Sequence, residues 1–248
     1  MKYLKFITFA VAFILMLGGN VQALIIDDFN DTGGQTLVQA GPGTVDSFKD
    51  DASILGGERD MRLVVISGTS GGRFSANGDV PDALALSMNS GSTGQARIQW
   101  DGDDGAWGPP VDYDGLGVVD LTEGGANAGI EVLISGDDKI IPGGLELTAY
   151  FGDASNWARW NVNLPGPAFM PQVVQLSFLS LSSSAGIVDF TTVGAITLFL
   201  NVASQADADV TIDYIQTYTP PSTVPEPGTM LLFGSGLVGV YFVRKRIS

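Results

Sequence analysis

Carboxylates dominate the reactive groups of this sequence, while the residue types most used in nucleophilic catalysis and zinc binding are missing. The chain has no cysteine and no histidine, against 27 aspartates and glutamates. It therefore has no thiol nucleophile, no Ser-His-Asp triad, no ordinary zinc site and no disulfide. The remaining chemistry, that of carboxylates, amides, hydroxyls and aromatic rings, suits cation binding, acid–base hydrolysis and recognition of polar ligands.

Paired carboxylates can hydrolyse glycosides when one carboxyl has a raised pKa and the two are suitably separated. Glu123, Glu131 and Glu146 are the candidates. Residues 24–219 contain 26 acidic residues, so pairs that approach each other by chance are expected. We therefore predict no catalytic residues and no enzyme activity, with a carboxylate-dependent polysaccharide-active enzyme as the alternative.

A loop rich in aspartate, DGDDGAWGPPVDYDG (Asp101–Gly115), is a second place where carboxylates gather. Asp101 and Asp103 have the spacing that begins an EF-hand calcium loop. The rest of the pattern fails, because Gly105 offers no side-chain oxygen and Ala106 occupies the position of the EF-hand glycine. The preferred interpretation is a turn whose aspartates bond their own backbone, with weak Ca²⁺ binding as the alternative.

Four tryptophans provide rings on which a sugar can stack. Trp157 and Trp160 are three residues apart, so in a strand they face opposite sides, one in the core and one exposed or at a sheet edge. Trp107 lies in the polar aspartate loop and is therefore the candidate sugar platform.

Short apolar runs that alternate with period two indicate β-strands, and Gly, Asn and Asp pairs between them indicate tight turns. With no amphipathic helix between them, they predict one all-β domain over residues 24–219, an antiparallel β-sandwich of jelly-roll-like type. In the last run, Val210, Ile212, Tyr214 and Gln216 are predicted to share one face. The runs are Met61–Ser67, Ala96–Trp100, Gly129–Ser135, Leu145–Phe151, Trp157–Leu164, Ala195–Val202 and Asp209–Tyr218.

The charge of this domain limits its partners. Residues 24–219 contain 7 lysines and arginines against 26 acidic residues, a net charge of about −19. Such a surface repels nucleic acid and anionic lipid, so no nucleic-acid partner is expected. It favours divalent cations and neutral or cationic partners.

The N-terminus has the three parts of a secretory signal peptide. Lys2 and Lys5 precede an uncharged run over Phe6–Gly19, and small residues lead to Ala23. We predict that residues 1–23 are a signal peptide cleaved after Ala23, which makes this an exported protein. The alternative is a first transmembrane helix that is retained.

The C-terminus combines a spacer, an apolar run and a basic end. Residues 220–227 are rich in proline and predict an extended chain. Gly228–Val243 carries no charge and is slightly shorter than the roughly 20 residues that span a bilayer, and Arg244, Lys245 and Arg246 follow. Residues 228–248 therefore predict a membrane-associated helix with its basic end in the cytoplasm.

Pro225, Glu226 and Pro227, followed by that apolar run and basic end, resemble a PEP-CTERM sorting signal. The resemblance implies recognition of this Pro-Glu-Pro triplet by an exosortase-type enzyme and cleavage near it. The chain would then be anchored in the inner membrane only transiently, before reaching the cell surface or the extracellular space. A plain single-span anchor is the alternative.

The domain itself resembles carbohydrate-binding jelly rolls of the galactose-binding-like type. LIIDDFND (Leu24–Asp31) is similar to their opening strand, and DFTTVGAITLFLN with VTIDYIQT is similar to their closing strands. The resemblance implies a structural Ca²⁺ with Asp28 and Asp213 as ligands, and no other cofactor. Alternatively, Asp28 caps a turn and Asp213 is a solvated strand residue.

Together these features predict a non-enzymatic surface or matrix component, associated with exopolysaccharide and biofilm and able to bind glycans. A lectin-like module with a defined ligand is the alternative within the binding class.

Overall fold

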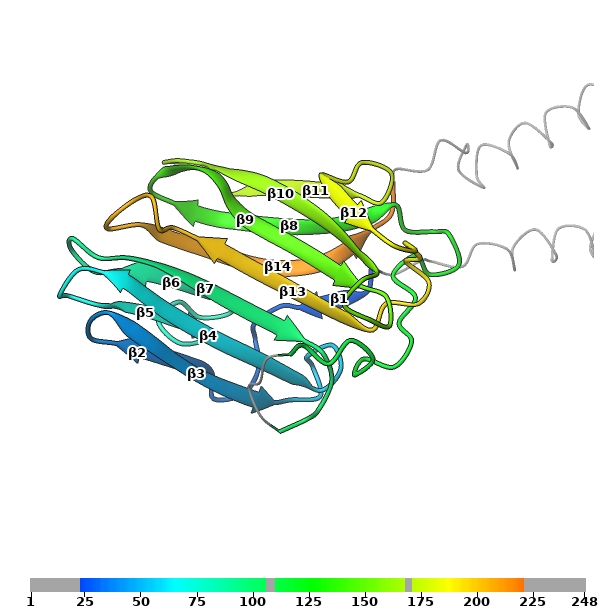
Figure 1. Cartoon of the computed structure of the whole chain (residues 1–248), viewed down its shortest axis with the longest axis horizontal. Coiled ribbons are helices and arrows are strands. Elements are labelled where there is room, and N and C mark those ends of the chain that lie inside the picture. Colours follow the sequence, from blue (N-terminus) through cyan, green and yellow to red (C-terminus); the bar gives the residue numbers. More distant parts are fainter. Residues whose placement is uncertain (1–22, 106–109, 168–170, 221–248) are drawn as a thin grey trace, which may run out of the picture. The chain divides into compact units, whose positions relative to one another are not determined.

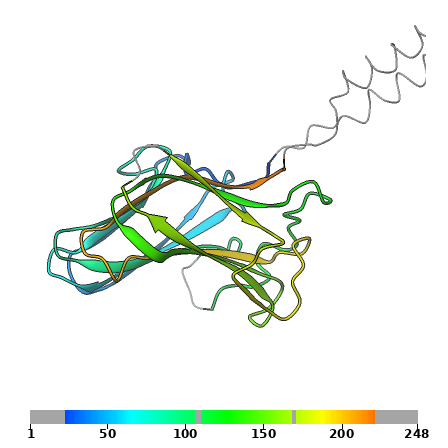
Figure 2. The ribbon, with the colours of Figure 1, turned by 90° about the horizontal axis from the view of Figure 1, so that it is seen from above.

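The structure is a computed structural model that describes residues 23–105, 110–167 and 171–220. The strands lie in one compact unit, Ala23–Tyr218, and form two antiparallel sheets that face each other (Figures 1 and 2). Within these ranges no helix is long and apolar enough to cross a membrane. The predicted signal peptide (residues 1–23) and the predicted spacer and sorting signal (residues 220–248) lie outside the described residues, except for Ala23 and Pro220.

Sheet A has the strand order β11-β8-β14-β6-β5-β2, with β1 paired to β14. The first and last strands of the domain are therefore neighbours, since Asp27 of β1 is opposite Ile215 of β14. The strands of sheet A are β1 (Ile25–Asp27), β2 (Gln35–Gln39), β5 (Gly72–Ala76), β6 (Leu84–Met88), β8 (Gly129–Asp137), β11 (Gln172–Ser177) and β14 (Asp209–Tyr218).

Sheet B has the order β12-β10-β9-β13-β7-β4-β3, so its central strand, β13, is among the last in the sequence. Every pair of neighbouring strands in it is antiparallel. Its strands are β3 (Gly43–Asp50), β4 (Glu58–Ser67), β7 (Thr93–Trp100), β9 (Ile140–Tyr150), β10 (Trp157–Pro165), β12 (Ser183–Ala185) and β13 (Ala195–Asn201).

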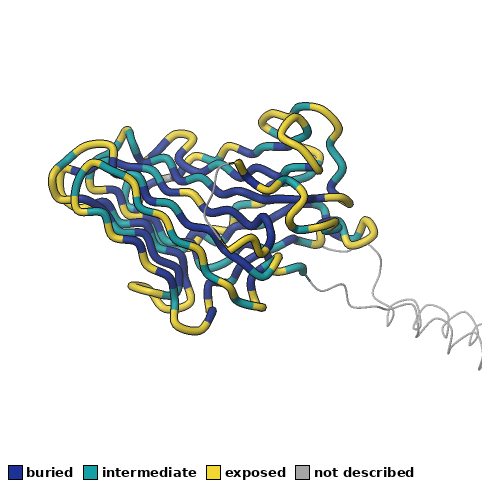
Figure 3. The backbone as a smooth tube through the Cα atoms, turned by 60° about the horizontal axis from the view of Figure 1, so that its bottom comes forward, coloured by how far each residue is buried: buried dark blue, intermediate teal, exposed yellow. Residues whose placement is uncertain are grey.

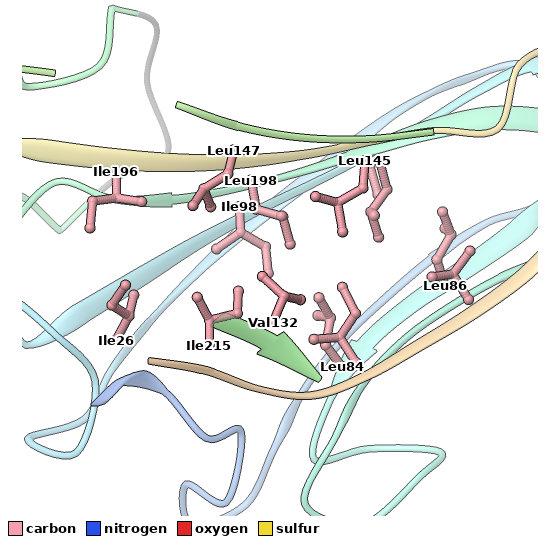
Figure 4. Close-up of a cluster of buried hydrophobic side chains, with 14 of the residues drawn as sticks. Ile26, Leu84, Leu86, Ile98, Val132, Leu145, Leu147, Ile196, Leu198 and Ile215 are labelled. Carbon is pink, nitrogen blue, oxygen red and sulfur yellow. The ribbon is translucent and has the colours of Figure 1, made fainter. Parts of the chain in front are cut away.

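The core fills the space between the inner faces of the two sheets. Ile98 and Leu147 of sheet B point toward Val132 of sheet A, and all three are fully buried (Figure 4). Burial follows the period-two pattern along the strands, and the exposed positions concentrate in the turns (Figure 3). Removing these apolar faces from water holds the sheets together, at about 25 cal/mol per Å².

The predicted β-sandwich is confirmed, and each of the seven predicted runs contains a strand. Six strands were not predicted from alternation or resemblance. Four of them are short, and β3 and β11 carry several exposed residues, because they lie at or near sheet edges where only one face is buried.

One predicted face is wrong. Val210 and Ile212 of β14 face the core as expected, but Tyr214 and Gln216 are only half buried and Ile215 faces the core instead. The pairing of β14 with β8 shifts on either side of Ile212, which is a β-bulge. The extra residue, Asp213, reverses the in–out order of every residue after it.

A buried ionic cluster joins the sheets beside this core. The guanidinium of Arg59 on β4 is fully buried and donates to both carboxylate oxygens of Asp27 at 2.9 and 3.1 Å. It also donates to Asp31 at 2.8 Å and to Gln35 at 3.0 Å. The indole of Trp100 donates to Asp27 at 3.0 Å. Arg59 therefore connects β1 and the segment after it to sheet B.

Candidate functional site

A row of side chains crosses the outer face of sheet B at right angles to its strands. Successive members occupy positions directly opposite one another on neighbouring strands. With strands about 4.8 Å apart, six members extend over roughly 24 Å. From β10 to β3 this cross-strand row consists of Asn161, Glu146, Phe199, Arg97, Arg62 and Asp46.

The centre of the row combines an aromatic ring with two neighbouring arginines. The guanidinium carbon of exposed Arg97 lies 5.5 Å from the centroid of the Phe199 ring, on the neighbouring strand. Arg62, directly opposite Arg97 on the other side, donates to the two carboxylate oxygens of Asp46 at 2.6 and 2.9 Å. Among the described residues no salt bridge joins Arg97 to a carboxylate. Arg97 is exposed on this face, where a ligand can reach it.

A second aromatic group lies beside the β10 end of the row. The guanidinium of Arg159 lies 4.7 Å from the Trp157 ring, forms an ion pair with Glu146 at 3.2 Å and donates to Thr148 Oγ1 at 3.2 Å. Trp157 is opposite Tyr150 on β9. Arg97 and Arg159 therefore each have a guanidinium group held against an aromatic ring. This contact restricts the two side chains before a ligand arrives, so less conformational entropy is lost on binding.

Trp160, on the same strand, is buried, and its indole nitrogen donates to the Ser177 carbonyl at 2.9 Å. Trp157 is half buried on the outer face. The predicted division of these two tryptophans between core and surface is confirmed.

At its β10 end the row meets a groove of about 410 Å³ at the edge of the sandwich, between β10 and β11. Asn161 belongs to both, which makes the two surfaces continuous. The other groove residues with polar side chains are uncharged amides and hydroxyls, together with the indole of Trp160. They are Asn163, Gln175, Ser177, Ser180 and Ser182.

The chemistry of this combined surface is that of a binding face. Flat rings contact apolar sugar or other ring faces, and arginine forks, amides and hydroxyls supply directed donors and acceptors. The row is an open sheet surface rather than an enclosed pocket, so it fits an extended ligand that continues past both ends.

The three candidate catalytic glutamates do not converge. Glu131 lies on the outer face of sheet A, where it accepts from Gln216 at 2.7 Å and Tyr214 at 3.3 Å. Glu146 lies on the outer face of sheet B, and Glu123 is exposed in a loop. A glycosidase pair needs separations below about 10 Å across one substrate, so these residues do not form one.

The two predicted calcium ligands lie near the junction of β1 and β14. The Asp28 carboxylate accepts from the Asn30 backbone at 3.4 Å and from its side chain at 2.9 Å. Asp213, at the bulge, accepts from the Ser135 hydroxyl. Within the described ranges neither belongs to a group of three converging acids. Calcium binding by Asp28 and Asp213 remains a prediction.

The remaining predicted site residues are outside the described part of the chain. Trp107, the sorting triplet Pro225, Glu226 and Pro227, and the basic residues Arg244, Lys245 and Arg246 fall there. Cleavage after Ala23 is likewise still a prediction.

A second group of side chains was missed by sequence reasoning. Glu58 and Asp60 open β4, point to the outer side of sheet B and are only 1% exposed. Burial, and then the neighbouring charge of Asp101, raise the pKa of Asp60 to about 8. Burial is also the main cause that raises the pKa of Glu58 to about 7. The sequence signal that could have revealed this group is the Glu-Arg-Asp triplet just before the predicted start of the strand at Met61. Its two acids are two residues apart and therefore share one face of the strand.

The C-terminal tail matches a known family. Residues 223–246 match the PEP-CTERM protein-sorting motif. This match confirms the resemblance seen in the sequence and marks the chain as a secreted sorting substrate that passes through a membrane. It implies processing by an exosortase. Among curated proteins none matches the chain.

Solved structures with related strand arrangements include modules and parts of enzymes. A family 11 carbohydrate-binding module from Clostridium thermocellum, in complex with a β-1,3-1,4-mixed-linked tetrasaccharide, has 13% identity and a TM-score of 0.38, covering 81% of this chain and 98% of that one. An exo-β-agarase has 12% identity and a TM-score of 0.41, covering 81% of this chain and 25% of that one. A family 29 module mutant bound to mannohexaose has 8% identity and a TM-score of 0.31, covering 79% and 92%.

Proposed function

Since the chain is an exported sorting substrate, we propose that its sandwich domain is a non-catalytic binder of neutral exopolysaccharide at the cell surface or in the extracellular matrix. The observation that carries the proposal is the cross-strand row with its continuous edge groove. Together they offer an aromatic centre, oriented arginine forks and uncharged amides on one open surface.

The charge of the domain supports a neutral ligand. With a net charge of about −19 over residues 24–219, the domain repels polyanions at long range. The row also contains the carboxylates of Glu146 and Asp46, which accept hydrogen bonds from sugar hydroxyls but repel uronates. A face that carries both guanidinium and carboxylate groups offers hydrogen-bond donors and acceptors together, which suits the hydroxyl groups of an uncharged sugar chain.

The openness of the surface supports a polymer rather than a short oligosaccharide. A row of roughly 24 Å that continues into a groove makes repeated contacts along a chain and none that require a chain end. This separates the proposal from its alternative, a lectin-like module for a defined oligosaccharide. A polysaccharide-active enzyme is disfavoured because Glu131 and Glu146 lie on opposite outer faces.

For the route to this location, we propose that the signal peptide over residues 1–23 starts export and that residues 228–248 hold the chain briefly in the inner membrane. The basic end, Arg244 to Arg246, would remain in the cytoplasm until an exosortase releases the domain.

The test is affinity electrophoresis of the exported protein in gels that contain exopolysaccharide purified from the producing strain. We expect the polysaccharide to retard the protein, and Arg97→Ala or Phe199→Ala to weaken binding about tenfold or more, as truncation of central contact residues does. Arg73→Ala is the matched control, because Arg73 lies on β5 of sheet A, away from the row. It should leave retardation unchanged.

Three outcomes would contradict the proposal. Retardation that survives both row variants would place the binding surface elsewhere. Release of new reducing ends from the same polysaccharide would favour the enzyme. Retardation that short oligosaccharides abolish at equal sugar concentration would favour the lectin-like alternative over a polymer-binding surface.

A further inference from the structure

Acidic side chains from three segments converge at the end of sheet B where β3, β4 and β7 meet the aspartate loop. Glu58, Asp60 and Asp104 each direct a carboxylate oxygen to within 4.8 Å of the others. A second group, Asp50, Glu58 and Asp103, has the same property and shares Glu58. The β3–β4 hairpin and the described residues that follow β7 therefore place two groups of acids around Glu58.

Two of these carboxylates have oxygens that nothing in the described structure satisfies. Glu58 Oε2 accepts from the Gly105 backbone at 2.9 Å, but Glu58 Oε1 is buried with no hydrogen-bond partner. Asp60 Oδ1 is likewise buried and unpartnered. An unpaired buried carboxylate costs several kcal/mol, and two side by side repel each other as well. The two residues that carry these oxygens both belong to the converging group of Glu58, Asp60 and Asp104.

We propose that Glu58, Asp60 and Asp104 form a divalent-cation site of the calcium class, with Asp50 and Asp103 contributing charge beside it. Hard cations bind carboxylate oxygens, and a cation offsets both the burial and the mutual repulsion of these groups. The site is distinct from Asp28 and Asp213, and it does not depend on the proposed glycan binding.

The origin of the ligands in separate segments of the chain favours calcium over magnesium. Calcium accepts six to eight oxygens at about 2.3–2.6 Å in flexible geometry. Magnesium needs about 2.0–2.1 Å and near-octahedral order, which five acids from separate segments do not readily supply. A catalytic role for Glu58 and Asp60 is disfavoured, because both are only 1% exposed and a substrate could not reach them.

The surroundings of the site show what a cation stabilises. Asp101 Oδ2 accepts from the Asp112 backbone at 2.9 Å and from Gln99 at 3.2 Å, which holds the far end of the loop against β7. A Cβ on Gly115 would lie 1.6 Å from the Asp101 carbonyl oxygen, so the loop returns in close contact there. Asp104 lies near the start of the same loop. A cation bound there would link this part of the loop to β4.

The test compares thermal melting and calorimetric titration of the exported protein after EDTA treatment, with CaCl₂ and MgCl₂ as the probes. At Ca²⁺ a hundredfold above its dissociation constant we expect a melting-temperature rise of about 5–10 °C. Asp60→Asn and Asp104→Asn should each remove most of this rise. In EDTA, Asp60→Asn should melt at or above the wild-type temperature, because it replaces a buried acid that lies beside other acids with a neutral side chain of the same shape.

Asp137→Asn is the matched control. Asp137 is buried, accepts from the Gly166 backbone at 2.9 Å and has an unpartnered Oδ1, yet it belongs to neither converging group. It should keep the full calcium response. A response that survives Asp60→Asn and Asp104→Asn, or that Asp28→Asn or Asp213→Asn abolishes instead, would overturn the proposal. If the Asp60→Asn protein does not fold, the calcium response of the Asp104→Asn protein tests the proposal alone, because Asp104 is exposed.

Discussion

Replacing Arg59 with alanine is expected to lower the free energy of unfolding by about 3–5 kcal/mol, a large part of the 5–15 kcal/mol typical of a domain. The substitution leaves Asp27 and Asp31, 2% and 3% exposed, as buried charges without their main partner. It also removes a guanidinium that lies 5.7 Å from the Phe29 ring and bonds Gln35. Chemical denaturation followed by tryptophan fluorescence measures the change, because Trp100 bonds the same carboxylate.

Arg62→Ala is the matched control for this prediction. Arg62 is three residues away on β4 and also makes a two-bond ion pair, with Asp46, but both partners are about 30% exposed. Exposed pairs contribute under about 1 kcal/mol, so Arg62→Ala should change the unfolding free energy little. Equal effects of the two substitutions would show that the burial of Arg59 does not matter. A stable Arg59→Ala protein would show that the ionic cluster does not join the sheets.

The fold could be predicted from sequence because its central strands obey one rule. Where a strand is packed on its inner face, as in Gly129–Asp137, alternation of apolar and polar residues follows directly from period-two geometry. Edge strands such as β3 lack this signal, because alternate residues there are half buried rather than buried. A single inserted residue, Asp213, then reverses the predicted face for the rest of β14.

The candidate site was less predictable, because it depends on strand order. Trp157 and Trp160 could be assigned to opposite faces from their spacing alone. Arg97 and Phe199 are about a hundred residues apart, and only the pairing of β7 with β13 brings them together. The group formed by Glu58, Asp60 and Asp104 could not be predicted for a related reason. Asp104 follows β7, and only the pairing of β7 with β4 brings it close to the other two acids.

Replacing Pro225, Glu226 and Pro227 with alanines is expected to abolish release of the domain. Residues 223–246 match the sorting motif, and the triplet is the part of the motif proposed to be recognised by the processing enzyme. Without recognition, the uncharged run Gly228–Val243 and the basic end remain attached and hold the chain at the inner membrane. Intact mass spectrometry of membrane and external fractions measures the change.

The same spacer supplies the control, because Pro220 and Pro221 lie outside the matched residues. Pro220→Ala with Pro221→Ala changes the same residue type in the same segment and should leave release intact. An external form of the wild-type chain that still carries Arg244 to Ser248 would contradict processing altogether. Release of the triple-alanine variant would show that the apolar run and basic end, rather than the Pro-Glu-Pro triplet, direct processing. Because the strands of the sandwich end at Tyr218, before either substitution, both variants should keep the wild-type melting temperature, which separates a sorting defect from a folding defect.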